Sequence, residues 1–104
     1  MHEQAAVAAL YALAPSAGLA AFRRLIRAGR QGLAARELEA AVNDPAVTLS
    51  DYLEPLERAG LVSSRRDQGT LVYAADFDGM NELWAFLMAT SSEEVLEFIG
   101  KGSA

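Results

Sequence analysis

Residues 47–77 read as an amphipathic helix followed at once by two short strands, and this order constrains the fold most. The helix carries a leucine stripe at helical spacing, made of Leu49, Leu53 and Leu56. Gly60 suits the left-handed residue that ends a helix. The strands "LVSSR" and "TLVYAA" flank "RDQG", where Gly69 can adopt the positive φ of a hairpin turn. With a short helix over 34–42 before it, the segment predicts a helix pair beside a hairpin.

The remaining apolar periodicity predicts three more helices and a short last one. The first runs about Glu3–Ala14. The second runs about Ala17–Ala28, with four apolar residues inward (Leu19, Phe22, Leu25 and Ile26) and three arginines outward (Arg23, Arg24 and Arg27). We expect Asp44 to cap the fourth helix, Pro45 to occupy its first position, and Asp78 or a neighbour to cap the fifth. Ser91 with Glu94 forms a capping box for a short helix ending near Gly100.

The predicted fold is mainly α with a small β-hairpin, in the order α-α-α-α-β-β-α. A close helix pair with a hairpin beside its second helix is a winged helix-turn-helix. The length of 104 residues predicts a single domain over 1–104.

Composition limits the classes of function. The chain is 52% hydrophobic with a net charge of −5, but residues 1–36 hold five Arg and one Glu, a local net of +4. The absence of cysteine excludes disulfides and thiolate metal sites. No stretch approaches the apolar length of a membrane span, and the start "MHEQ" lacks a signal-peptide pattern. We therefore expect a soluble, cytoplasmic protein with no membrane partner.

The chain resembles the ArsR–SmtB type of dimeric winged-helix repressors over roughly residues 5–90. The resemblance lies in "ALYALA", "GLAARELEAAV", "TLSDYLEPLERAGLV" and "SSRRDQGTLVYAADF". It implies a homodimer through the first and fifth helices that binds a double-stranded, palindromic DNA operator. The fourth helix would lie in the major groove, the wing would contact the flanking backbone, and an effector would release the DNA.

The resemblance gives a set of candidate DNA-binding residues: Thr48, Ser50, Asp51, Tyr52, Arg65, Arg66 and Thr70. Hydroxyls and guanidinium groups can donate to base edges and phosphates. We favour DNA contact for this set; the alternative is that Thr48 and Ser50 merely cover the surface of the helix. The acids Asp51, Glu54 and Glu57 can accept from cytosine amino groups, but we favour a solvated face.

Two further features of the sequence can each be interpreted in two ways. Pro55 lies about ten positions into the expected helix, where it removes a backbone hydrogen bond and predicts a kink. The kink would either re-aim Tyr52 and Asp51 or mark a helix that no longer fits a groove. The arginine run of the second helix is read as a solvated face, with contact to the operator backbone as the alternative.

The candidate dimer interface is an apolar stripe shared by the first and fifth helices: Val7, Leu10, Tyr11, Met80, Leu83, Trp84, Leu87 and Met88. A small monomer cannot bury so much apolar surface by itself.

Departures from the family pattern decide against metal sensing. Arsenic-sensing relatives place cysteines where this chain has Ala34 and Arg36, others carry a cysteine pair where it has Ser91-Ser92, and a hydroxyl does not replace a thiolate as ligand. The zinc-sensing type uses Asp and His around the fifth helix, where Asp76 and Asp78 remain but no His follows. We expect no metal site, no cofactor and no enzymatic activity, since no phosphate loop or catalytic triad is present. The sequence does not identify the effector. The expected function is a dimeric, repressor-like DNA-binding regulator; the alternative is a winged-helix interaction module that no longer reads an operator.

Overall fold

The computed structural model describes residues 1–89 of the chain. Its elements are α1 (Glu3–Leu13), α2 (Ser16–Ala28), the 3-10 helix η1 (Gly29–Gln31), β1 (Leu33–Ala34), α3 (Ala35–Val42), α4 (Leu49–Arg58), β2 (Val62–Asp67), β3 (Thr70–Ala75) and α5 (Phe77–Leu87). The predicted order of helices and hairpin is confirmed, with β1 as an addition. The helix expected at Ser91 and Glu94 lies outside the described residues.

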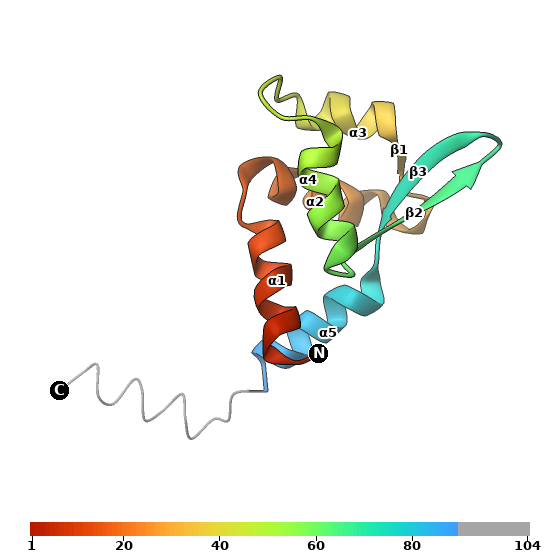
Figure 1. Cartoon of the computed structure of the whole chain (residues 1–104). Helices are drawn as coiled ribbons and strands as arrows, with labels where there is room; N and C mark the ends of the chain where they lie inside the picture. The colour runs from red at the N-terminus through yellow and green to blue at the C-terminus, as the bar shows by residue number, and fades with distance from the viewer. Residues whose placement is uncertain (90–104) are drawn as a thin grey trace.

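The three strands form an antiparallel sheet in the order β1-β3-β2 (Figure 1). In the hairpin, Ser64 faces Tyr73 and Arg65 faces Val72, so side chains alternate between the two faces of the wing. Tyr73 also pairs with Leu33 of β1. Gly32 permits this pairing, because at its φ of +70° a Cβ would lie 2.1 Å from the Tyr73 carbonyl oxygen.

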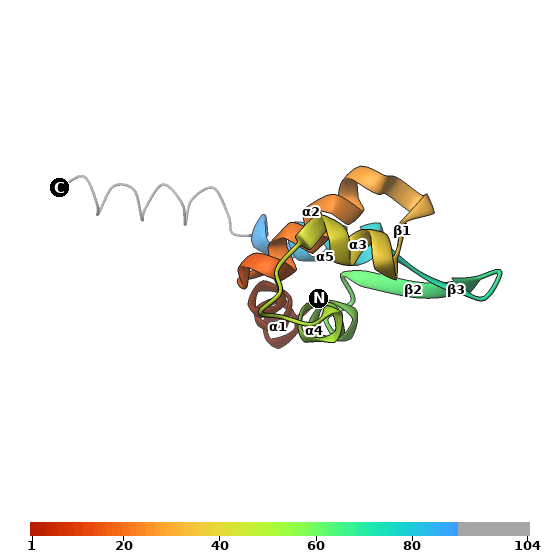
Figure 2. The same cartoon turned by 90° about the horizontal axis from the view of Figure 1, so that it is seen from above.

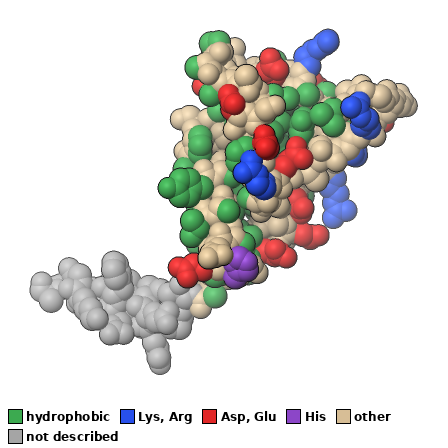
Figure 3. All heavy atoms as spheres, in the orientation of Figure 1, with side chains coloured by type: hydrophobic (Ala, Val, Ile, Leu, Met, Phe, Trp, Pro, Cys, Tyr) green, Lys and Arg blue, Asp and Glu red, His purple; other side chains and the backbone are tan. Residues whose placement is uncertain are grey.

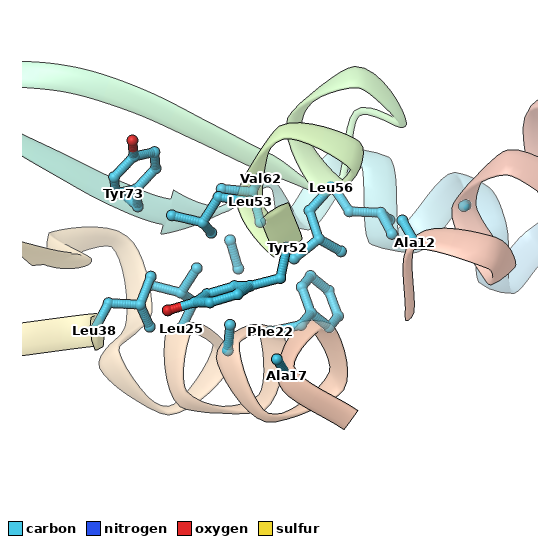
Figure 4. Packing of buried hydrophobic residues seen from close by; sticks show 14 of the residues in the cluster. Ala12, Ala17, Phe22, Leu25, Leu38, Tyr52, Leu53, Leu56, Val62 and Tyr73 are labelled. Carbon is cyan, nitrogen blue, oxygen red and sulfur yellow. The ribbon is translucent and has the colours of Figure 1, made fainter. Parts of the chain in front are cut away.

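The core lies between α2, α4 and the base of the sheet (Figure 4). Its fully buried leucines come from four elements or their ends: Leu25, Leu38, Leu53, Leu56 and Leu61. The side of α1 that faces this core consists of the small residues Ala6, Ala9 and Ala12. Small side chains let two helices approach closely, and Figure 2 shows α1 and α4 side by side.

The helix α4 begins later than the sequence indicated. Thr48 is its N-cap, and Thr48 and Asp51 exchange hydrogen bonds in a capping box, with 2.8 Å from the Thr48 amide to the Asp51 carboxylate. Asp44 does not cap the helix, which corrects our prediction. Its carboxylate accepts from the Ala46 amide at 3.0 Å and shapes the preceding turn. Pro55 is therefore the seventh residue of α4 and not about the tenth.

The end of α4 follows the prediction. Gly60 has a φ of +79°. The amide of Leu61 donates to the Leu56 carbonyl at 2.9 Å, and the amide of Gly60 donates to the Glu57 carbonyl at 3.0 Å. These two bonds form a Schellman motif, which stops the helix and turns the chain into β2.

Two expectations for the other helices need adjustment. Asp76, and not Asp78, caps α5 by accepting from the Gly79 amide at 3.0 Å. Leu19, expected inward, is 45% exposed on α2. Within residues 1–89 no single helix is long and apolar enough to cross a membrane, while α1 and α2 with η1 meet that limit only as a pair bent by 97°.

Candidate nucleic-acid interface

The helix α4 divides into a buried and an exposed side. Residues at helical spacing anchor it in the core: Tyr52, Leu53 and Leu56 are buried and Leu49 is partly buried. The opposite side is exposed and carries Ser50, Asp51, Glu54, Glu57 and Arg58. In Figure 1 this helix lies in front of α2, with the β2–β3 wing projecting beside it. The arrangement presents one helix face and one hairpin on a common surface.

Three of the predicted contact residues lie at the exposed start of α4. Thr48, Ser50 and Asp51 are all exposed. Thr48 and Asp51 are also partners in the capping box, so their side chains have a structural role that does not depend on any ligand. The Ser50 hydroxyl makes no hydrogen bond within residues 1–89, which leaves it available for an external partner.

The position of Tyr52 corrects our prediction that its side chain contacts DNA. It is only 4% exposed, and its ring lies in the core with Leu25, Leu38 and Phe22 (Figure 4). Burial raises the pKa of the Tyr52 hydroxyl above its ordinary value, and the carboxylates of Glu39 and Asp44 raise it further. The hydroxyl is therefore protonated at neutral pH. The ring cannot reach the edges of bases from this position.

Each acid on the exposed side of α4 accepts a hydrogen bond from within the chain. Asp51 accepts from the Thr48 amide. Glu54 pairs with Arg58 at 3.2 Å, an exposed ion pair one helical turn apart. Glu57 accepts from the Ser64 hydroxyl of β2 at 3.4 Å. The acidic character of this surface therefore follows partly from local stabilisation of α4 and its junction with the wing.

The wing arginines differ in their surroundings. Arg65 donates to the carbonyl oxygen of Gln31 at 2.8 Å and of Arg30 at 3.5 Å, which ties the wing to η1. Arg66 donates to the Gly69 carbonyl at 3.3 Å, inside the hairpin, and to no other residue of the described range 1–89. Thr70, at the start of β3, is exposed. The sequence could not predict these hydrogen bonds of Arg65, because their acceptors are backbone carbonyl groups, which every residue has.

The predicted dimer residues fall into two groups. Six are exposed on α1 and α5: Val7, Leu10, Tyr11, Trp84, Leu87 and Met88. Leu83 is 6% exposed and packs in the core of the same chain, which corrects its assignment to an interface. Met80 packs against the same core but is only partly buried, so its assignment stays a prediction. Figure 3 shows hydrophobic side chains along the α1 edge of the molecule and basic ones toward the wing. Exposed apolar patches of this kind mark interaction surfaces.

Metal ligands do not gather in the part of the chain that the structure describes: residues 1–89 contain no group of three or more His, Asp or Glu side chains placed to share an ion. Asp76, one of the acids at the position used by zinc-sensing relatives, caps α5.

The two close helices α3 and α4, the wing and the supporting helices form a winged helix-turn-helix fold of ArsR-like architecture. Over 96% of this chain and 92% of the other, the structure is similar to an ArsR-like transcriptional regulator from Rhodococcus sp. RHA1, with a TM-score of 0.72 and 20% identity.

Two further solved structures have higher identity. One is the homodimeric winged helix-turn-helix DNA-binding domain of a possible ArsR-family transcriptional regulator from Mycobacterium bovis, with 25% identity, a TM-score of 0.63, and coverage of 91% of this chain and 84% of the other. The other is NolR from Sinorhizobium fredii, with 27% identity, a TM-score of 0.61, and coverage of 84% and 85%. No protein-family model and no curated protein matches the sequence.

Proposed function

We propose that this protein is a dimeric, repressor-like transcriptional regulator that binds double-stranded DNA. The observation that supports this most directly is the pairing of an exposed α4 face with the Arg65–Arg66 wing on one surface. Likeness to the Mycobacterium bovis DNA-binding domain supports it further. The chain has no cysteine, so regulation does not use the thiolate metal sites of metal-sensing relatives.

In the proposed complex the start of α4 enters the major groove and the wing follows the neighbouring backbone. Ser50 and Thr48 offer hydroxyl groups to bases or phosphates, and Arg66 offers a guanidinium group to phosphate. Arg65 can contribute charge while it holds the wing against η1. Tyr52 supports α4 from the core side.

The proposed dimer forms through the exposed apolar residues of α1 and α5. They are exposed in the part of the protomer that the structure describes, and a second copy would cover them. The homodimeric state of the Mycobacterium bovis domain supports this arrangement. A twofold dimer presents two copies of α4 and therefore favours a palindromic operator.

Fluorescence anisotropy on the DNA upstream of the protein's own gene tests the proposal, with a random duplex of equal length as control. We expect tighter binding to the upstream DNA and a steep loss of affinity with salt, because binding releases counterions from phosphates. Arg65→Ala/Arg66→Ala should weaken binding and lower the salt slope by about two. Arg23→Ala/Arg24→Ala removes equal charge from α2 and tests whether the effect belongs to the wing.

A second candidate function has one observation in its favour. Three of the exposed residues of α4 are acids, and this surface suits a basic protein better than DNA. A protein that showed no preference for its upstream DNA over the random duplex at low salt, and that co-purified with a basic partner through α4, would be an interaction module.

A further inference from the structure

Four arginines are exposed together on α2 and on η1, which follows it directly. We call them the arginine face of α2: Arg23, Arg24, Arg27 and Arg30. Three of them, at positions 23, 27 and 30, recur at intervals of four and three residues, so they form one stripe along the helical surface. With a rise of about 1.5 Å per residue in an α-helix and about 2.0 Å in a 3-10 helix, the stripe is roughly 10 Å long.

No acid neutralises the arginine face of α2 within the part of the chain that the structure describes. Residues 15–36 contain five arginines and no acid. In residues 1–89 the ion pair is that of Arg58 with Glu54 on α4, so none of the four arginines is paired. Glu37, the next acid along the chain, accepts from the Ala34 amide at 3.1 Å at the start of α3. The exposed side of α4, in contrast, carries three acids and one arginine, so the arginine face of α2 is the more electropositive surface.

The arginine face of α2 is directed away from α4. Phe22 and Leu25 lie on the other side of α2, are buried, and extend into the core toward Tyr52 and Leu53 of α4 (Figure 4). The exposed side of α2 is therefore opposite the side that packs under α4. DNA bound along the exposed side of α4 would leave the arginine face of α2 uncovered.

Hydrogen bonds from the wing fix one end of the arginine face of α2. The Arg65 guanidinium group donates to the carbonyl oxygens of Gln31 at 2.8 Å and of Arg30 at 3.5 Å. These bonds hold the backbone of η1 in place and bring a further guanidinium group close to Arg30. The positive surface therefore continues from α2 to the base of the wing.

The chemistry of the arginine face of α2 fits a phosphate backbone. Its charged groups are all guanidinium groups, whose planar donors match phosphate oxygens in pairs. One strand of a DNA duplex places a phosphate about every 3.4 Å along the axis, so a stripe of roughly 10 Å can contact about three phosphates. Isolated exposed ion pairs with carboxylates add little to affinity. A polyanion gives more, because arginines that neutralise its phosphates also release condensed counterions.

We propose that the arginine face of α2 binds the phosphate backbone of double-stranded DNA without sequence preference, as a second surface separate from that of α4. The inference goes beyond the proposed function, since this contact requires no operator sequence and does not involve α4. A protomer with both surfaces occupied holds two segments of DNA.

Titration of the ¹⁵N-labelled protein with the random duplex locates the contact by NMR. We expect saturable shifts of amides in residues 19–31, on α2 and η1. The random duplex lacks the upstream sequence, so the result is independent of operator recognition. A protein that lost its preference for upstream DNA but kept these shifts would contradict the proposed function and support the second surface.

Anisotropy titrations of the random duplex across a salt series test the role of the arginines. Arg24→Ala/Arg27→Ala should weaken binding and lower the salt slope by about two, because two phosphate contacts are lost. Arg24→Lys/Arg27→Lys keeps the charge and should keep the slope. Ala41→Glu/Asn81→Asp changes the net charge by the same amount at exposed positions of α3 and α5, and should leave the slope unchanged.

Three outcomes would overturn the proposal. The first is an absence of shifts in residues 19–31, and the second is an equal loss of slope in Arg24→Ala/Arg27→Ala and Ala41→Glu/Asn81→Asp. The third is tighter binding of poly-L-glutamate than of the random duplex at equal charge concentration, which would assign the arginine face of α2 to an acidic protein. The dispersion of each variant's NMR spectrum verifies its fold.

Discussion

At the scale of single residues, the acids of α4 combine a structural role with a position on the proposed DNA-binding surface. Glu54 pairs with Arg58, but both side chains are about 70% exposed, at 70% and 72%. Exposed pairs one helical turn apart stabilise a helix by only about 0.3–0.5 kcal/mol. The effect of Glu54 on a bound phosphate backbone should therefore exceed its effect on folding.

Glu54→Gln tests this balance. We expect the free energy of unfolding to change by less than about 0.5 kcal/mol. Affinity for upstream DNA should rise several-fold at low salt and converge with the original protein at high salt, since screening weakens the removed repulsion. Anisotropy titrations across a salt series measure this. Weaker binding by the variant would instead show that Glu54 accepts a hydrogen bond from a base.

The tyrosines give the protein a dependence on alkaline pH. Burial, with nearby carboxylates, raises the pKa of the hydroxyl groups of Tyr52 and Tyr73. Below about pH 10 both folded and unfolded chains keep these protons, so stability does not change. Above it the unfolded chain ionises first and binds fewer protons, and the free energy of unfolding must fall.

Urea unfolding at about pH 9 and about pH 11 measures this loss of stability. We expect Tyr52→Phe to show a smaller decrease between the two conditions than the original protein, since one of the raised groups is gone. Tyr11, which is 77% exposed, provides the matched control as Tyr11→Phe. An equal decrease in the Tyr52→Phe and Tyr11→Phe variants would contradict the assignment.

Residue-level prediction from the sequence succeeded where local geometry decides. Gly60 at the end of α4 and Gly69 in the hairpin both have positive φ, as their places in the pattern required. Tyr52 was misplaced because the resemblance put it among the DNA-binding residues, although its spacing from Leu49 and Leu56 also suits the buried stripe. The phenol ring is amphipathic, so the sequence alone did not fix whether it faced the core or solvent.

At the scale of elements, long periodic helices were predictable and short elements defined by distant pairing were not. β1 contains two residues and exists only because it pairs with β3, some forty residues later. The start of α4 was missed because Asp44 and Pro45 form a plausible helix start, whereas Thr48 and Asp51 complete a reciprocal capping box.

The junction between α4 and α5 depends on a glycine whose role is steric. A Cβ added at Gly79 would lie 1.8 Å from the carbonyl oxygen of Gly60, which is backbone and cannot rotate away. Gly79→Ala must therefore displace α5 from the end of α4. We expect a loss of at least about 2 kcal/mol in the free energy of unfolding, measured by urea denaturation. Asn81→Ala, an exposed position on the same helix, should change stability little; equal effects would show that α5 already has room to move.

At the scale of the whole molecule, α5 contributes to the core on one side and presents an apolar face on the other. Leu83 is buried, while Trp84 and Met88 are more than 60% exposed, at 64% and 62%. The two sides predict different outcomes for substitution. Leu83→Ala should destabilise the fold by about 2–5 kcal/mol, because it leaves a cavity in the core.

Trp84→Glu should leave the protomer folded and separate the proposed dimer, because an exposed side chain adds nothing to the core but a charge opposes apolar contact between two copies. Light scattering after size exclusion should then give the protomer mass of 11.1 kDa for the variant and about twice that for the original protein. Ala41→Glu adds an equal charge to the exposed surface of α3 and should leave the dimer intact. In the proposed complex two copies of α4 bind two half-sites, so Trp84→Glu should also weaken binding to upstream DNA more than Ala41→Glu does. A dimeric Trp84→Glu variant would place the interface elsewhere on the molecule.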